Sequence, residues 1–402
     1  MSARRGPSRR SSRPAVALAA LLLALALPAA ASAAPVLVLG KDGRVRVHQD
    51  RFVPDATPVA PPTSAAAFAA GRAARASAIR SSAVPRALTR LWRRGAIDGA
   101  ERADRLASWN AARATLRRLG GRRRAELGAV VANTAAIAAA GRLTASRLEP
   151  VFLTLDRNRQ WWPIGRLVLY GERVGFQGSG LIWQSYPGQG LQLQMLANFG
   201  KANGLWQARI NGELRDLLDE LVPLAARRGR GIAWEYYFRF GGGVPPWTSA
   251  MSQGTAVQAL ARAAKRLHDR TYLSVARRAL PIFSESPPVG VRRRMRRGPW
   301  YLLYSYAPRQ LVLNGFLQSL IGLYDFWKLG RNAHAGRLFR AGDRVARRSL
   351  RRYDTGSWSL YEPGVRSDYS YHVLVRDFLR GLCRRTDARP YCAMAERFTS
   401  YL

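Results

Sequence analysis

The fold class can be inferred from two consecutive stretches, VLNGFLQSLIGLYDFWK (Val312–Lys328) and AGRLFRAGDRVARRSLR (Ala335–Arg351). The first is apolar around almost its whole circumference, which predicts a buried helix. The second keeps its apolar residues on one side and its arginines mainly on the other, which predicts a helix half exposed to water. Such pairs are what an (α/α) toroid needs, with inner helices lining an axis and outer helices meeting solvent. A helical solenoid would show similar pairs, but the chain has no fixed repeat period.

The residues before these stretches continue the helical pattern. Leucines at three- and four-residue steps predict a helix over about 205–228, and 231–240 has the character of a strand. Thr248 or Ser249 can cap a further helix, and 272–280 predicts another. The expected fold class is therefore mainly α: an (α/α) toroid over 151–402, with an attached β-hairpin and small-sheet elements.

The N-terminal half divides into three segments. Residues 1–33 have the basic start, the apolar run and the small-residue cleavage site of a signal peptide, so we expect an exported protein that is secreted, periplasmic or in the cell envelope. An uncleaved N-terminal anchor is the alternative. Residues 34–64 predict a short β-hairpin around a Gly-Lys-Asp-Gly turn, followed by a Pro/Ala linker. Residues 65–150 are Ala- and Arg-rich and predict two to four helices draped over the larger body, without an independent core.

Composition narrows the function classes. The 402 residues carry 65 Lys+Arg against 25 Asp+Glu, a net charge of +40, and 48% of them are hydrophobic. That apolar fraction excludes a disordered polycation. The four histidines lack metal-ligand spacing, and no metal or cofactor is expected. No apolar stretch after residue 33 is long enough for a membrane span. Cys383 and Cys392 can form a disulfide in an exported protein, although the sequence does not show that they face each other.

The positive charge has several readings. The large excess of Arg over Lys fits a GC-rich genome as well as a function. As a functional feature, it suits nucleic acid, anionic lipid or acidic polysaccharide, because each offers closely spaced negative charge. Outside the cell we expect an acidic polysaccharide as partner. We expect no nucleic acid, because no helix-turn-helix, zinc-finger or aromatic RNA-binding pattern is found.

The common catalytic motifs are missing. There is no G-x-S-x-G elbow, no H-E-x-x-H and no P-loop, which argues against a serine hydrolase, a metallopeptidase and an NTPase. Instead, aromatic residues cluster with Gly and Pro at 183–190, 245–254 and 301–316. Aromatic faces beside amide side chains suit sugar rings. Each cluster taken alone is also compatible with ordinary aromatic core.

Four ordered motifs resemble the C-terminal domain of D-glucuronyl C5-epimerases. They are YPGQG (186–190) with FGKAN (199–203), PPWTSAMSQG (245–254), VLNGF (312–316) with IGLYD (321–325), and YDTGS (353–357) followed by Tyr371-His372. The resemblance covers about residues 180–402 and identifies the chain as a divergent, exported relative of that family. It implies an (α/α) toroid, a homodimer, and action on hexuronic acids of glucuronate/iduronate type in heparosan-like polysaccharides.

The resemblance also implies which residues act. Inverting C5 of a uronic acid removes a proton next to a carboxylate and returns one to the opposite face, so two acid/base groups must flank the ring. Tyr304 and Tyr371 match catalytic tyrosines of the family, and Tyr361 matches a third. Tyr371 shares a predicted helical face with apolar residues, which aims it inward. A tyrosine acts as base only if its pKa falls toward neutrality, and clustered guanidinium groups are one way to lower it. The residues expected to bind substrate are Tyr186, Gln189, Trp247, Gln253, Arg309, Asn314, Glu362, Arg366 and His372.

The sequence departs from the family pattern at two positions. Leu303 precedes Tyr304 where the family has an acidic residue, and Gly364 stands where an Arg is expected. Glu362 or Arg366 can replace these groups from nearby, and Arg309 can reach a carboxylate. Three readings stay open: an exported uronyl C5-epimerase-like enzyme, a non-catalytic envelope protein that binds an acidic glycan, and a polysaccharide lyase or glycoside hydrolase. The last would use carboxylates from the set Asp354, Glu362 and Asp368.

Overall fold

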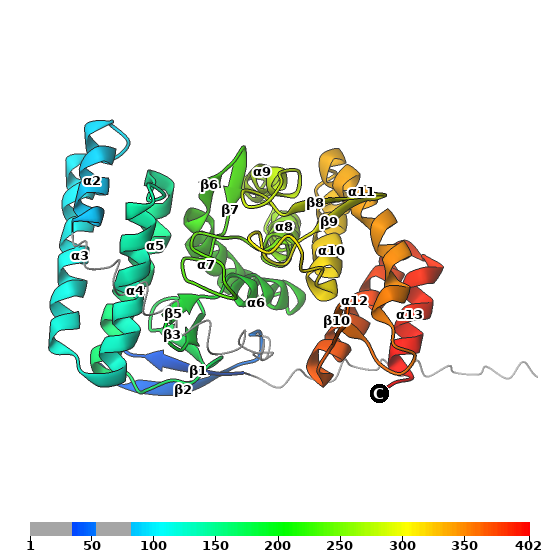
Figure 1. Cartoon of the computed structure of the whole chain (residues 1–402), viewed down its shortest axis with the longest axis horizontal. Coiled ribbons are helices and arrows are strands. Elements are labelled where there is room, and N and C mark those ends of the chain that lie inside the picture. Colours follow the sequence, from blue (N-terminus) through cyan, green and yellow to red (C-terminus); the bar gives the residue numbers. More distant parts are fainter. Residues whose placement is uncertain (1–33, 54–81) are drawn as a thin grey trace, which may run out of the picture. The chain divides into compact units, whose positions relative to one another are not determined.

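The computed structural model describes residues 34–53 and 82–402 (Figure 1). Within these ranges the chain is mainly helical, with one five-stranded sheet and three two-stranded ones. The predicted mainly α class with small sheet elements is thus confirmed. None of the helices in this part of the chain is long and apolar enough to cross a membrane. The predicted signal peptide and Pro/Ala linker lie outside the described residues.

The five-stranded sheet begins with the predicted hairpin. Strands β1 (Ala34–Leu39) and β2 (Val45–Asp50) pair antiparallel. Strand β1 also pairs in parallel with β3 (Arg173–Phe176), and β4 (Trp183–Tyr186) and β5 (Gly190–Leu193) complete the order β2-β1-β3-β4-β5. The last three strands are buried along their whole length, although they also carry polar side chains such as Gln184 and Gln192. Through them the sheet carries Tyr186 toward the helical part.

The second described range, which starts at residue 82, begins with four helices: α2 (Ala83–Arg93), α3 (Gly99–Arg118), α4 (Gly121–Ala139) and α5 (Ala145–Ile164). The expectation that they lack a core of their own is wrong, because Trp109, Leu148, Phe152 and other apolar side chains form a separate buried cluster among them. Alanines let these helices approach closely, so a few large side chains fill the space between them. Helix α5 runs through the predicted domain boundary at residue 150 and carries Trp161 into the main core.

The C-terminal part is a series of helix pairs. The first members are α6 (Met195–Gln207), α8 (Ala250–Arg266), α10 (Leu313–Leu329) and α12 (Tyr369–Thr386), and each packs against the next one in this series. Each is followed by a partner that packs on it: α7 (Asn211–Leu221), α9 (Thr271–Ala279), α11 (Ala333–Ser349) and α13 (Arg389–Thr399) (Figure 1). Helix α8 is buried almost all round, whereas α11 exposes its arginines. Inner and outer helices thus alternate along the chain, as an (α/α) toroid requires. Closure of the helices into a full ring stays a prediction.

Two boundaries differ from those expected between α6 and α8. The helix predicted over 205–228 is interrupted at Arg209, whose φ of 61° ends α6 before α7 begins. The leucine periodicity belongs to α7 and to the short 3-10 helix Val222–Leu224 that follows it, and the chain then enters strand β6 (Ala226–Arg228). The strand predicted over 231–240 is reduced to β7 (Gly231–Ala233), followed by an isolated bridge between Tyr236 and Trp247. Ser249 caps α8, accepting a hydrogen bond from the Ser252 main-chain nitrogen.

Two further hairpins connect the later helices. Strands β8 (Arg292–Met295) and β9 (Gly298–Tyr301) pair before α10, and β10 (Leu360–Glu362) and β11 (Val365–Arg366) pair before α12. Strand β9 leads directly into the loop that carries Tyr304, and β10 carries Tyr361. The two hairpins therefore position two of the predicted catalytic tyrosines, Tyr304 and Tyr361.

Cys383 of α12 and Cys392 of α13 form a disulfide, with an S–S distance of 2.11 Å. The bond closes a short ring of the chain and ties the last helix to the one that carries Tyr371. Replacing both cysteines by serine should lower the free energy of unfolding by about 2–3 kcal/mol, the chain-entropy contribution of a loop of roughly ten residues. Denaturant unfolding with and without reductant measures this effect. A wild-type protein whose midpoint is unchanged by reductant would contradict the prediction.

Candidate active site

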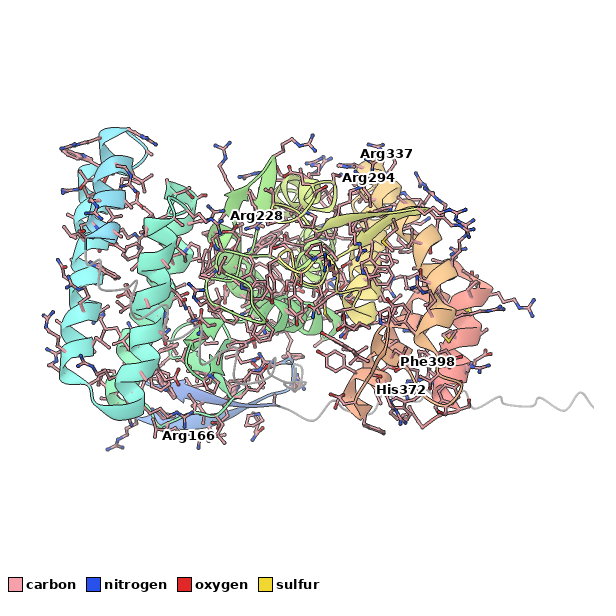
Figure 2. All side chains as sticks on the ribbon, viewed as in Figure 1. Arg166, Arg228, Arg294, Arg337, His372 and Phe398 are labelled. Atoms are coloured by element: carbon pink, nitrogen blue, oxygen red, sulfur yellow. A yellow bond between two sulfur atoms is a disulfide. The ribbon has the colours of Figure 1, made fainter. Side chains whose placement is uncertain are left out.

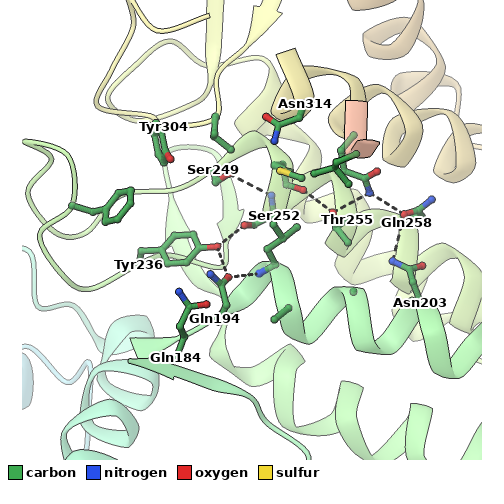
Figure 3. Close-up of a pocket in the computed structure, with 18 of the residues that line it drawn as sticks. Gln184, Gln194, Asn203, Tyr236, Ser249, Ser252, Thr255, Gln258, Tyr304 and Asn314 are labelled. Atoms are coloured by element: carbon green, nitrogen blue, oxygen red, sulfur yellow. Dashed lines mark hydrogen bonds between the residues drawn. The ribbon is translucent and has the colours of Figure 1, made fainter. Parts of the chain in front are cut away.

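A pocket of about 420 Å³ lies among the first members of the helix pairs, within the usual size range of small-ligand sites (Figure 3). Helices α6, α8, α10 and α12, the five-stranded sheet and the loops after β7 and β9 all contribute to its wall. The lining combines aromatic rings with many amide side chains, such as Gln184, Gln194 and Asn203. It includes two arginines, Arg173 and Arg262, and neither an aspartate nor a glutamate. This composition suits an anionic, hydroxyl-rich ligand.

The three predicted catalytic tyrosines converge at this pocket. Tyr304 and Tyr371 line the pocket directly, and Tyr361 packs beside them without lining it. The rings of Tyr361 and Tyr371 lie 4.9 Å apart, nearly perpendicular to each other. The phenols of Tyr304 and Tyr371 both lower the pKa of Tyr361, which places the three hydroxyls near one another. The structure thus brings together phenol groups that are up to 67 residues apart in the chain.

Helix capping and an apolar face position Tyr371. Asp368 caps α12 by accepting a hydrogen bond from the Tyr371 main-chain nitrogen at 2.8 Å, so Tyr371 lies in the first turn. Its ring points inward on the same face as Leu374 and Phe378, which also line the pocket. Asn314, in the first turn of α10, also lines the pocket and lowers the pKa of Tyr371. Two helix starts therefore lie beside this hydroxyl.

Main-chain hydrogen bonds position Tyr304. The Leu302 carbonyl accepts from the Ala250 nitrogen at 3.0 Å, and the Ser305 nitrogen donates to the Thr248 carbonyl at 3.0 Å. The Thr248 nitrogen in turn donates to the Ser305 hydroxyl at 3.1 Å. The loop after β9 is therefore held against the start of α8 on both sides of Tyr304. This contact joins two of the motifs that carry the family resemblance.

Burial raises the pKa of Tyr304, of Tyr361 and of Tyr371, and it is the largest cause for each of them. No arginine is among the principal causes of these shifts, so clustered guanidinium groups do not offset burial at these three tyrosines. Arg173 does lower the pKa of Tyr236, but burial outweighs it and raises that pKa to about 12. The phenols are therefore protonated at neutral pH. The contacts with Tyr304 and Tyr371 lower the pKa of Tyr361, in part opposing its burial.

Three of the residues expected to bind substrate line the pocket: Tyr186, Trp247 and Asn314. The ring of Trp247 is stacked on Tyr236, with centroids 4.3 Å apart, so one of its faces is already covered. Figure 3 shows Tyr236 and Tyr304 on one side of the pocket and Asn314 near the start of its helix. Leu303, at the position of the family's acidic residue, also lines the pocket.

Three other expected residues are buried outside the pocket lining. The side-chain oxygen of Gln189 accepts two hydrogen bonds and its nitrogen donates one. Gln253 donates to the Trp234 carbonyl at 3.1 Å. Both ring nitrogens of His372 are hydrogen-bonded, Nδ1 to Ser359 and Nε2 to a carbonyl of α13. Gln189 and His372 hold neighbouring segments together, because their polar atoms are engaged within the protein. In Gln253 only the side-chain nitrogen is engaged, and its buried oxygen has no hydrogen-bond partner.

The remaining three, Arg309, Glu362 and Arg366, also lie outside the lining. Arg309 and Arg366 are exposed, and the guanidinium of Arg366 lies 5.3 Å from the Trp358 ring centroid. Glu362 is half-buried, and burial raises its pKa. The family has charged residues where this chain has Leu303 and Gly364. Because all three side chains lie outside the pocket lining, none of them supplies a replacement charge to the pocket wall.

Sequence reasoning missed the two arginines of the lining. Arg173 is buried at the start of β3. Arg262 donates to Asn203 and Asp325 at 2.9 Å each, and Asp325 also binds Arg385. One signal was available in α8, where Thr255, Gln258 and Arg262 follow one another at helical spacing on an otherwise apolar helix. Polar side chains on a buried face of that kind indicate a cavity.

The fold and the pocket together define a mainly helical domain with a tyrosine-lined site. Residues 228–400 match the model of the family described as D-glucuronyl C5-epimerase C-terminus, and this part of the chain belongs to that domain family. The match includes Tyr304, Tyr361 and Tyr371, whereas Tyr186 and Arg173 lie before it. The predicted family assignment is therefore confirmed for the C-terminal domain.

Among curated proteins, a D-glucuronyl C5-epimerase of Caenorhabditis elegans is 40% identical over 131 residues, 29% of this chain and 21% of that protein. An uncharacterized protein of Methanocaldococcus jannaschii is 28% identical over 173 residues, 40% of this chain and 54% of that protein. The chain thus spans about a fifth and about half of these relatives. Among solved structures, the endo-beta-1,4-glucanase CMCax of Acetobacter xylinum aligns with a TM-score of 0.38 and 11% identity, over 52% of this chain and 72% of that one.

Proposed function

We propose that the protein is an exported uronyl C5-epimerase-like enzyme that acts on an acidic polysaccharide of glucuronate/iduronate type. The observation that carries this proposal is the convergence of Tyr304, Tyr361 and Tyr371 at a pocket whose lining has arginines and no carboxylate. A uronate bound there would bring its own negative charge to Arg173 and present C5 to phenol groups. Tyr304 and Tyr371 would exchange the C5 proton, each from one face of the sugar.

Tyr361 completes the reaction cycle. One tyrosine, as phenolate, takes the C5 proton, and the electron pair left behind is delocalised into the sugar carboxylate, next to the positive charge of the pocket. The other tyrosine then gives its proton to the opposite face of C5. At that point the first phenol is protonated and the second is a phenolate. Because Tyr361 lies beside both of these tyrosines, it can pass a proton from the first to the second and restore the starting state.

The contacts of the carboxylates argue against a glycoside hydrolase. That chemistry needs paired carboxyl groups at the sugar. Asp354 is bound to Arg397 at 2.6 Å, Asp368 caps α12, and Glu362 lies outside the lining. A non-catalytic glycan-binding protein is the second candidate, favoured by Leu303 in the pocket wall and by the raised pKa values of the tyrosines.

Proton exchange tests the proposal. The full chain is incubated in D2O with heparosan and other uronate polymers, and deuterium at C5 and the epimer ratio are followed by NMR. Epimerase activity incorporates deuterium and forms the second epimer. Unsaturated chain ends would instead identify a lyase, in which the same carbanion expels the C4 substituent. Salt-sensitive binding of every polymer without exchange would select the non-catalytic candidate.

The raised tyrosine pKa values predict a steep pH profile. The phenolate fraction of a group far below its pKa grows tenfold per pH unit, so kcat/KM should rise by about tenfold per unit between pH 6 and 9, with no plateau. Polymer binding measured over the same range is the control, since the arginines stay charged throughout. A plateau near neutral pH would show that the base is a group other than these tyrosines.

A further inference from the structure

The β8–β9 hairpin and helix α11 carry an arginine-rich surface outside the pocket. The side chains of these arginines are exposed or half-buried, and none of them lines the pocket. They are Arg293, Arg294, Arg296 and Arg297 of the hairpin and Arg337, Arg340, Arg344 and Arg348 of α11. We call this set the hairpin–α11 surface.

Acidic residues do not balance this surface. Residues 286–352 contain 15 Lys and Arg and two acidic residues, Asp325 and Asp343. Both of these carboxylates are buried and already paired: Asp325 with Arg262 and Arg385, and Asp343 with Arg347. A GC-rich genome explains arginine in place of lysine, but it does not explain a local shortage of acids. The surface therefore projects a concentrated positive field.

The two elements form one continuous surface. A Cβ placed on Gly298, beside the hairpin turn, would lie 2.9 Å from the Ala341 carbonyl oxygen, so the hairpin rests directly on α11. The Tyr301 hydroxyl also donates to the Leu338 carbonyl at 2.8 Å. Figure 2 labels Arg294 of the hairpin and Arg337 of α11 toward the same side of the view. The arginines of both elements are thus available to a single extended ligand.

The surface is also linked to the pocket through the chain. Strand β9 runs without interruption into Leu302, Leu303 and Tyr304, which is part of the pocket wall. Helix α11 follows α10, which contributes Asn314. A polymer bound along the hairpin–α11 surface would therefore lie on elements directly adjoining the site.

We propose that the hairpin–α11 surface is a second binding site, for a stretch of an acidic polysaccharide distant from the sugar in the pocket. The identity of the polymer rests on the proposed function. The surface itself favours a polysaccharide over other polyanions. Neither the hairpin nor α11, both within the described part of the chain, has an exposed large apolar or aromatic side chain. Insertion into a membrane and stacking of nucleic-acid bases both rely on such side chains.

The test compares two triple variants that remove the same charge. One is Arg294→Ser, Arg296→Ser, Arg297→Ser in the hairpin, and the control is Arg86→Ser, Arg90→Ser, Arg93→Ser on the exposed face of α2. Binding of heparosan at about 50 mM NaCl should weaken at least tenfold in the hairpin variant and less than twofold in the control. The slope of log affinity against log salt should fall by about two to three in the hairpin variant, roughly one for each lost contact with the polyanion.

Activity separates the second site from the pocket. In the hairpin variant, KM for the polymer should rise while exchange on a short uronate oligosaccharide stays within twofold of wild type. The pocket variant Tyr371→Phe should keep wild-type polymer affinity. In one outcome, the wild type exchanges no uronate at C5 while the hairpin variant alone loses polymer binding. That result would support the second binding site and contradict the epimerase proposal.

Two outcomes would overturn the second site. Equal losses in the hairpin and α2 variants would show that only the total charge of the protein matters. A hairpin variant with unchanged polysaccharide affinity but weakened binding to anionic phosphatidylglycerol vesicles or duplex DNA would assign the surface to a lipid or nucleic-acid partner instead.

Discussion

Tyr371→Phe is expected to lower the rate of C5 inversion by about 10²- to 10⁴-fold, the usual contribution of a general acid or base. The substitution removes one oxygen from the pocket wall and keeps the ring that packs against Tyr361. The fold should persist, because the α12 cap uses the main-chain nitrogen of this residue and not its hydroxyl. The measurement is NMR of the epimer ratio in D2O.

Tyr304→Phe should reduce inversion to a similar extent, and the two variants should differ in the exchange that remains. When one of two opposed bases is missing, the other can still remove and return a proton on its own face. Each variant should therefore retain slow deuterium exchange from one epimer without inverting it, and the favoured epimer should be opposite in the two. This opposite preference would not result from general damage to the pocket.

Tyr306→Phe is the matched control. Tyr306 lies on the same loop, and its ring stacks on Tyr304 with centroids 5.4 Å apart, but it does not line the pocket. Its loss of a hydroxyl should change the inversion rate by no more than a few-fold. An active wild type whose Tyr304 and Tyr371 variants both keep full inversion would remove these tyrosines from the mechanism.

The parts of the fold that could be predicted are those set by neighbouring residues. Helix α10 was evident because its apolar residues surround the axis, and the start of α8 because Ser249 precedes it as a cap. The interruption at Arg209 was missed, since a single residue with positive φ leaves no periodic signal. Such a break depends on how α6 and α7 pack on the rest of the protein.

Only some of the residues at the candidate site could be predicted from the sequence. Family motifs located Tyr304 and Tyr371, but the same motifs also suggested Gln189 and His372, whose polar atoms are engaged inside the protein. A motif does not distinguish a side chain that lines a pocket from one that supports its wall. Arg173 was missed because it reaches the pocket through the pairing of β3 with β1, a contact between segments more than 130 residues apart.

Gly322→Ala is expected to destabilise the protein by at least about 3 kcal/mol, at the upper end of the range for overpacked cores. Helices α8 and α10 cross where Gly254 faces Gly322, and a Cβ on Gly322 would overlap the carbonyl group of Gly254. A Cβ on Gly254 would likewise lie 2.7 Å from the Cα of Ser319. Because the obstructing atoms are main chain, no side-chain rotation relieves the clash, and the two helices must separate.

Helix propensity works in the opposite direction and allows a matched control. Alanine is favoured over glycine by up to about 1 kcal/mol in a helix, so a substitution at an open position should be neutral or stabilising. Gly212, in the first turn of α7, has no atom within 4 Å of an added Cβ. We therefore expect Gly212→Ala to leave the urea midpoint unchanged or slightly raised, while Gly322→Ala lowers it sharply or prevents folding. Equal midpoints for the two variants would mean that α8 and α10 do not approach this closely, and that the pocket wall they form has a different geometry.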